Sequence, residues 1–375
     1  MAADGNITKD IIYDAVAPDD FESMLELDRY GNRSTAFDKI ISATHDHFWD
    51  PLDKRYIDFD EPFDMENTMI LPEEMVISLQ TEYVSSRLTT RKDRVRFVNA
   101  FTLRTFSSIL HGEQGALNLS ASLCHVLKDQ GAQEYAANQT REEARHVTAF
   151  AKYIKARWGK PVECGPTLKA LLVDIIGSPE VYKKIIGMQM LVEGLAMGAF
   201  ATFHTKSHDP LLRRLTQLVM TDEAFHHKFG KIWADRTVPK LSPEEHERVE
   251  DWAAQCFQTL LFNLVAPSQK GVIYAQFGLD PDWVQAAVAE AITDEYRRER
   301  MAESTDIFRV LIKTLLSAGI ITARTAPFYA QYVNMDELRL EGDYMVGDAI
   351  AEEGIAYLKG INNSRKGIFQ IRAAE

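Results

Sequence analysis

Two short segments of the chain each place a carboxylate three residues before a histidine. Glu143 and His146 lie in TREEARHVTAF, and Glu223 and His226 lie in TDEAFHHKFG. Residues three apart share one face of a helix, so each pair presents a carboxylate and an imidazole to the same point in space. With 55 acidic residues and 10 histidines in the chain, chance alone predicts about 1.5 such pairs, so the pairs by themselves are a weak signal.

The segments that precede these pairs strengthen the signal. Each is long, largely apolar and carries a single acidic residue, which is Glu113 in the first and Glu193 in the second. Glu113 precedes Glu143 by 30 residues, and Glu193 precedes Glu223 by 30 residues, so the same arrangement occurs twice, offset by 80 positions. A lone carboxylate in an apolar interior is costly, and a shared cation charge explains these glutamates better than burial alone.

A pair of metal ions is the chemistry that this residue set indicates. Two antiparallel helix pairs packed together would bring four carboxylates and two imidazoles into one core. Oxygen donors with two nitrogens suit iron or manganese, whereas zinc prefers four ligands and readily takes sulfur. The competing interpretation is a set of solvated surface glutamates and buried structural histidines.

Four long helices must position these residues. The spacing of apolar residues at three and four predicts helices over roughly 91–129, 131–158, 179–207 and 210–236. Helix starts are marked by N-cap residues followed by proline, at Ser178–Pro179, Asp209–Pro210, Ser242–Pro243 and Asp280–Pro281. Strand signals are scarce, so the predicted fold class is all-α.

The chain is expected to form one domain with extensions, because no Gly/Ser-rich or Pro-rich linker divides it. Residues 1–85 are predicted to be an arm with short helices near 19–29 and 34–48, packing on a helix bundle that spans 86–240. Residues 241–375 are predicted to be a helical extension of two or three helices, with a final hairpin or short helix from residue 338.

Composition narrows the function classes. The net charge of −13 disfavours nucleic acid and anionic lipid as partners. Three cysteines without a CxxC motif are typical of reduced thiols, and the first residues carry no secretory signal, so a cytoplasmic protein is expected. The apolar segment from Ile185 to Phe203 has Glu193 at its centre, which predicts a buried helix rather than a membrane span.

The pattern Glu…Glu-x-x-His…Glu…Glu-x-x-His over residues 91–236 resembles the ligand signature of the ferritin-like di-iron carboxylate superfamily. The resemblance implies a ferritin-like four-helix bundle whose metal ligands are Glu113, Glu143, His146, Glu193, Glu223 and His226. It also implies that Glu143 and Glu223 bridge the two metals. The preceding acids would each accept a hydrogen bond from the metal-bound histidine of the opposite pair, Glu142 from His226 and Asp222 from His146.

No branch of the superfamily fits cleanly. Ribonucleotide reductase small subunits carry a tyrosine where this chain has Phe150, and acyl-carrier desaturases and multicomponent hydroxylases carry a threonine near Ala196 and Met197. Arylamine N-oxygenases add a third histidine at the position of Val219. Ligand-binding oxidases similar to reductase small subunits place a tyrosine where Met188 stands.

The resemblance implies an O2-activating di-iron oxidase or monooxygenase that acts on a small or medium, largely apolar organic substrate. Its cofactors would be two iron ions, or manganese and iron, with O2 as co-substrate and electrons from a separate ferredoxin or flavoprotein reductase. A homodimer is the expected assembly. The alternative is a di-metal protein without an organic substrate, which handles iron or generates a radical.

Two further features remain open at the level of sequence. His227 follows His226 and points about 100° away on a helix, so it is expected to be a surface residue or to lie just outside the ligand shell. Apolar residues one turn from the ligands form the core or also wall a substrate cavity. These are Phe106, Leu110, Leu117, Met190, Met197, Phe200 and Val219.

Overall fold

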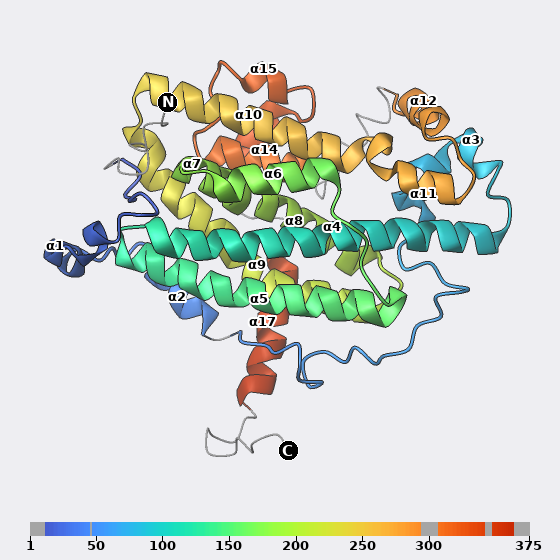
Figure 1. Ribbon diagram of the computed structural model, residues 1–375, viewed down its shortest axis with the longest axis horizontal. Coiled ribbons are helices and arrows are strands. Elements are labelled where there is room, and N and C mark those ends of the chain that lie inside the picture. Colours follow the sequence, from blue (N-terminus) through green and yellow to red (C-terminus); the bar gives the residue numbers. More distant parts are fainter. Residues whose placement is uncertain (1–11, 46, 294–306, 342–346, 364–375) are drawn as a thin grey trace.

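The computed structural model describes residues 12–45, 47–293, 307–341 and 347–363 (Figure 1). These residues form an all-α structure in which no strand occurs. The single β-type feature among them is an isolated antiparallel bridge between Ala15 and Leu127. The all-α fold class predicted from the sequence is therefore confirmed for the described part of the chain.

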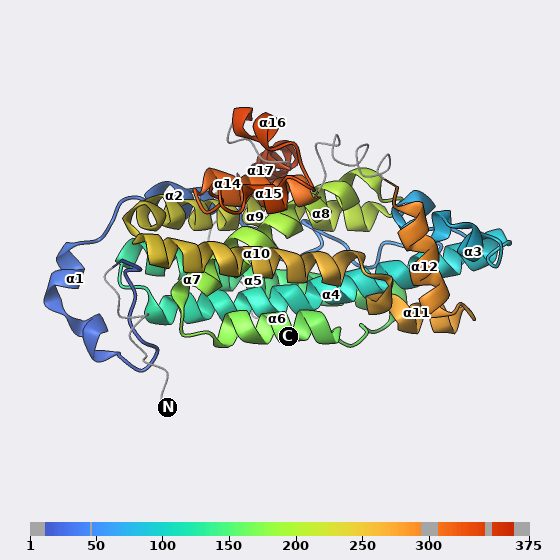
Figure 2. The same cartoon turned by 90° about the horizontal axis from the view of Figure 1, so that it is seen from above.

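The long helices lie close to the predicted ranges. They are α4 (Arg91–Val126), α5 (Gln130–Trp158) and α9 (Pro210–Thr237), together with one continuous helical run that comprises α7 (Val181–Lys184), η5 (Ile185–Val192) and α8 (Glu193–Lys206). Helix α4 packs along α5, α8 packs along α9, and α5 also contacts α9. Figure 1 shows α4 and α5 side by side, and Figure 2 shows the same helices from above.

Helix starts follow the local chemistry at three of the four predicted sites. Asp209 accepts a hydrogen bond from the backbone N–H of Leu211, Asp280 caps α12 (Pro281–Ala291), and Ser242 forms a reciprocal capping box with Glu245 at α10 (Pro243–Val265). The start predicted at Ser178 is wrong by two residues. Ser178 ends α6 (Pro166–Gly177), a short helix missed from the sequence because Gly165 precedes it without a side-chain cap.

The N-terminal region is less helical than expected. In place of helices near 19–29 and 34–48, the structure has η2 (Glu22–Leu25), α1 (Leu27–Gly31) and α2 (Asp38–Thr44). The following aromatic and acidic segment has no regular structure, yet Trp49, Tyr56 and Ile57 are almost fully buried. Three short helices then lead into α4, namely η3 (Glu73–Met75), η4 (Ile77–Gln80) and α3 (Glu82–Ser85).

The C-terminal region contains more helices than the two or three expected, because frequent proline and glycine residues divide it into short elements. After α10 come η7 (Pro267–Lys270), α11 (Gly271–Gln276), α12, α14 (Ile307–Ser317), α15 (Ala326–Tyr329) and α16 (Met335–Leu340). The last described element, α17 (Asp348–Asn363), packs against α9. The hairpin or short helix expected from residue 338 is thus a helix of 16 residues over its described part.

The combined helix from Val181 to Lys206 is long and apolar enough to cross a membrane by length and composition. About 72% of its most apolar window is buried inside the protein, where it packs against α9, α10 and α14. This burial is typical of a core helix that is apolar on all sides because protein surrounds it.

Two of the three clusters of buried apolar side chains lie along the same long helices. On α4, one cluster includes Ala116 to Val126 and the other includes Phe106 and Leu110. On α9, the clusters include Phe229 to Ala234 and Leu211 to Met220 respectively. The acidic and histidine residues of interest lie between the two clusters on each helix, so the fold holds a polar layer inside an apolar interior.

Candidate metal centre

All six predicted ligands are buried at one level of the long helices. Glu113 of α4 is 6% exposed and Glu193 of α8 is 3% exposed, while the other four are fully buried. Glu143 and His146 come from α5, and Glu223 and His226 come from α9. Each Glu-x-x-His pair occupies adjacent turns of its helix, as the three-residue spacing predicts.

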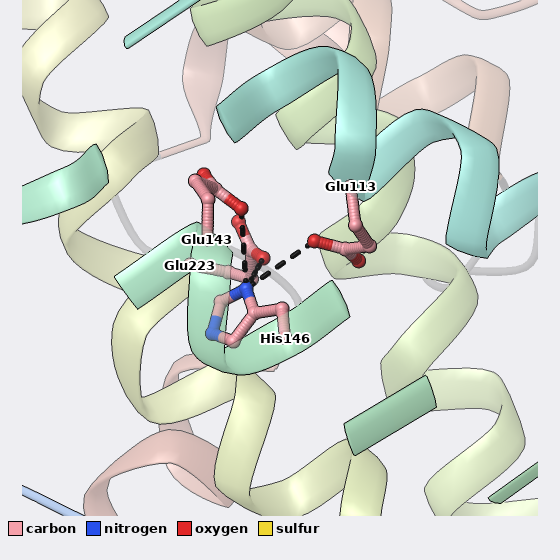
Figure 3. Close-up of side chains that lie close together, drawn as sticks. All are labelled: Glu113, Glu143, His146 and Glu223. Atoms are coloured by element: carbon pink, nitrogen blue, oxygen red, sulfur yellow. Dashed lines mark hydrogen bonds and ion pairs between the residues drawn. The ribbon is translucent and has the colours of Figure 1, made fainter. Parts of the chain in front are cut away.

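One half of the centre surrounds His146. Its Nδ1 atom lies 3.3 Å from Glu113 Oε2, 3.3 Å from Glu143 Oε2 and 3.2 Å from Glu223 Oε1. Figure 3 shows these three carboxylates converging on the same ring nitrogen from three different helices. The four side chains can place one atom each within 4.8 Å of one another, which is close enough to hold one metal ion.

The second half surrounds His226 and shares two carboxylates with the first. His226 Nδ1 lies 3.1 Å from Glu143 Oε1 and 3.0 Å from Glu223 Oε2. Glu143, Glu193, Glu223 and His226 form a second group with ligand atoms within 4.8 Å of one another. Glu143 and Glu223 therefore belong to both groups, each with one oxygen toward each histidine.

The outer nitrogen of each histidine is held by an acid from the opposite helix. His146 Nε2 lies 2.9 Å from Asp222 Oδ2, and His226 Nε2 lies 3.0 Å from Glu142 Oε2. If each Nε2–H donates to its acid, each Nδ1 is left to face the carboxylates as an acceptor or metal ligand. These are the two pairings that the family resemblance implies.

The carboxylates divide into two groups by their proton affinity. Burial raises the pKa of Glu113 to about 8 and raises the pKa of Glu193 well above its usual value, with repulsion from Glu223 and Glu143 adding to both. Burial acts in the same direction on Glu143, but the charge of His226 and the close approach of both imidazoles hold its pKa below the usual range.

The residues fit a pair of metal ions. Glu143 Oε2 and Glu223 Oε1 are buried and, within the described residues, accept no hydrogen bond. Buried carboxylate oxygens without a partner are costly, and a bound cation would satisfy them. Four carboxylates with two imidazoles and no thiolate match the preferences of iron and manganese.

Two neighbours of this centre, His47 and Trp49, were not predicted from the sequence. His47 Nε2 lies 3.2 Å from Asp222 Oδ1, and Trp49 Nε1 donates to Asp222 Oδ2 at 2.9 Å. Arg145 donates to the same oxygen at 2.8 Å. His47 lies at the end of the helix expected over 34–48, and Trp49 lies in the segment after it, which has no helical period, so no spacing could indicate their place beside α9.

One further neighbour could have been found from spacing. Gln139 lies one turn before Glu143 on α5, and its amide nitrogen donates to Glu143 Oε1 at 2.9 Å. His227 is 9% exposed, so of its two expected places the one at the surface is wrong. It belongs to neither ligand group, as expected for a residue that is not a ligand. Burial lowers the pKa of His227 to about 4, with Lys228 and Lys231 acting in the same direction.

Asp222→Asn is expected to weaken metal binding by about 10- to 100-fold, because an amide is a poorer partner for His146 Nε2–H and lacks the charge that balances Arg145. Metal affinity measured by competition with a chelator checks this. Asp235→Asn, at an exposed position on the same helix, is the matched control and should bind metal like the parent protein. Equal affinities in both variants would show that Asp222 does not orient the histidine.

Metal uptake is expected to release protons and to strengthen as pH rises. Below about pH 8 the metal-free Glu113 carboxyl carries a proton that a metal ion must displace, and the raised pKa of both imidazoles adds to this effect. Calorimetric titration with a divalent metal in two buffers of different ionisation enthalpy measures the proton count at pH 7. An affinity that stays constant from pH 6 to 8 would contradict the expected protonation.

Comparison with protein-family models, with curated proteins and with solved structures gave no match to this chain. What the structure does provide is an all-helical chain with buried carboxylate and histidine groups that could bind metal ions.

Proposed function

We propose that this chain is a ferritin-like di-metal protein that acts as an O2-activating di-iron oxidoreductase on a small or medium, largely apolar organic substrate. The observation that carries the proposal is the sharing of Glu143 and Glu223 by both ligand groups. Carboxylates that face two positions at once are suited to bridging a metal pair. A single-metal site would not need a second histidine on the far side of both glutamates.

The ferritin-like bundle is part of this proposal. Two helix pairs, α4 with α5 and α8 with α9, carry the same arrangement of ligands at the same spacing. This repeated pairing supports a bundle in which each pair contributes one carboxylate and one Glu-x-x-His motif.

A bound iron pair would supply the redox chemistry with O2. The protein's own residues do the remaining work. The four glutamates hold the ions and balance their charge, while Asp222 and Glu142 fix the orientation of His146 and His226. The two apolar clusters on either side of the polar layer exclude bulk water.

A cavity beside the ligands supports an organic substrate over iron handling alone. It has a volume of about 200 Å³, and Glu113 and Glu193 form part of its wall. Of the apolar residues that could be core or cavity wall, Phe200 lines this space, while the others are buried or half-buried elsewhere and do not line it. A cavity of about 150 Å³ holds a benzene ring, so this one has room for a small organic molecule.

The same proposal includes a separate ferredoxin or flavoprotein reductase as electron donor, a homodimeric assembly and a cytoplasmic location. Insertion of one oxygen atom of O2 into a substrate consumes two electrons and two protons and releases water. The net charge of −13 disfavours nucleic acid and anionic membranes as further partners.

Oxygen uptake by the iron-loaded protein tests this function. The protein is loaded with ferrous iron without air, supplied with a chemical electron donor and mixed with O2 in the presence and absence of candidate organic compounds. Uptake that continues only with an organic compound supports an oxygenase. Uptake that stops once the added iron is oxidised, whatever organic compound is present, would indicate iron handling instead.

A further inference from the structure

The cavity beside the candidate metal centre runs between α4 and α8. The two helices are antiparallel here, since Glu113 and Glu193 line one end, whereas Arg104 and Phe203 line the other. Helices α6 and α10 contribute Leu168 and Leu260 to its wall, and η7 contributes Gln269 and Lys270. The cavity therefore connects the candidate metal ligands to a second, chemically different end.

The two ends of the cavity differ in chemistry, since Arg104 and Lys270 line one end and two candidate metal ligands line the other. Arg104 and Glu113 are nine residues apart on α4, which corresponds to about 13.5 Å along the helix axis. Between them the wall is mainly apolar and includes Ile109, Ala196 and Phe200. A cationic end, an apolar middle and a metal-ligating end are thus arranged in that order.

Lys270 and Arg104 lie close together at the cationic end. Burial and, as the smaller cause, the charge of Arg104 together lower the pKa of Lys270 to about 8. The guanidinium of Arg104 is held in place because its Nη1 donates to the carbonyl oxygen of Glu163 at 2.6 Å. Both cations border the apolar wall of the cavity, and an anionic group placed between them would be attracted to both.

Lys270 also lies at the boundary between two cavities and lines both of them. A second space of about 120 Å³, lined by Leu71 and Phe101 among others, shares Thr105, Phe203 and Lys270 with the first. The Lys270 Nζ atom lies 5.4 Å from the centre of the Phe101 ring. A ligand that enters through the second space would therefore pass its polar end against Lys270 and extend its apolar end toward Glu113.

We propose that the substrate of this site is an amphipathic monocarboxylic acid, whose carboxylate is held by Lys270 and Arg104 and whose apolar chain extends along α4 and α8 to the metal ligands. This inference rests on the proposed function, because it names the substrate class of that site. A single negative charge suits the cavity better than a doubly charged phosphate, since the apolar wall makes desolvation of a second charge costly. The end of the chain remote from the carboxylate is then the end that meets the oxidant.

Binding of octanoate, 1-octanol and octylamine to the metal-loaded protein tests this proposal. Octanoate should bind roughly tenfold or more tightly than 1-octanol, because charge-assisted hydrogen bonds hold its head group. Octylamine should not bind measurably.

Lys270→Met should remove the preference for octanoate, and Lys270→Arg should retain most of it. Lys169→Met, which removes an exposed lysine of α6 outside the cavity, is the matched control and should leave all affinities unchanged.

A blocking variant tests the path of the chain. A Cβ atom at Gly112 would meet open space, so Gly112→Leu fills the cavity without a clash at the helix and should abolish octanoate binding. Equal affinity for octanoate and 1-octanol, or unchanged octanoate binding in Lys270→Met, would overturn the proposal. So would octanoate binding that requires metal, because the carboxylate would then sit at the ions.

Metal content measured in each preparation separates failure of the proposed substrate class from failure of the proposed function. Protein that holds the metal pair but does not prefer octanoate contradicts only the substrate class. Protein that takes up no metal contradicts the proposed function, whatever it binds in the cavity.

Discussion

Glu143→Gln is expected to reduce the iron content of the loaded protein from about two ions per chain to less than one. Glutamine has the shape of glutamate but lacks its charge and one acceptor oxygen. Because Glu143 faces both His146 and His226, its loss weakens both metal positions at once. Elemental analysis of the purified, iron-loaded variant measures the effect, and oxygen uptake should fall with it.

Two controls accompany this variant. Glu134→Gln removes an exposed carboxylate from the same helix, and His227→Ala removes a buried imidazole next to a predicted ligand. Both should keep the parent metal content. A Glu143→Gln protein with full metal occupancy would show that this glutamate does not bridge the ions.

Asp209→Ala is expected to lower the free energy of unfolding by about 3–5 kcal/mol, the cost of breaking a buried ion pair. The Asp209 carboxylate is fully buried and receives hydrogen bonds from Arg157 Nε at 2.7 Å, Arg157 Nη2 at 2.9 Å and Tyr153 Oη at 3.0 Å. It also caps α9, so it joins the two helices that carry the Glu-x-x-His pairs. Without it, the guanidinium of Arg157, whose side chain is only 4% exposed, loses its counter-charge.

Asp280→Ala is the matched control for this prediction. Asp280 is also an N-cap before a proline, but it caps α12 at an exposed position, so its loss should cost about 1 kcal/mol. Chemical denaturation of both variants, followed by circular dichroism, gives the comparison. A similar loss in both would mean that Asp209 acts as a helix cap and contributes nothing through the buried ion pair.

The long helices and the residues that meet between them were predictable because the spacing of apolar residues within each segment indicates a helix without knowledge of its tertiary contacts. Glu113 and Glu193 stand alone in apolar segments, and equal spacing relates them to Glu143 and Glu223. Four helices of that length can bury such residues only by placing them at a common level.

Other parts of the centre depend on tertiary contacts that no local pattern carries. Trp49 reaches Asp222 across 173 residues of sequence, from a segment without regular structure. The π-helical stretch η5, which ends immediately before Glu193, gives no composition signal that separates it from an α-helix. Such stretches occur frequently at functional sites, and this one sets the position of Glu193 on its helix.

The central claim is a pair of metal ions held by Glu143 and Glu223 together, and the most direct test is elemental analysis of iron-loaded protein combined with Mössbauer spectroscopy. The site predicts about two irons per chain in a magnetically coupled pair. Protein without metal after loading, or with a single uncoupled iron, would contradict the claim and leave the six residues as a structural polar cluster.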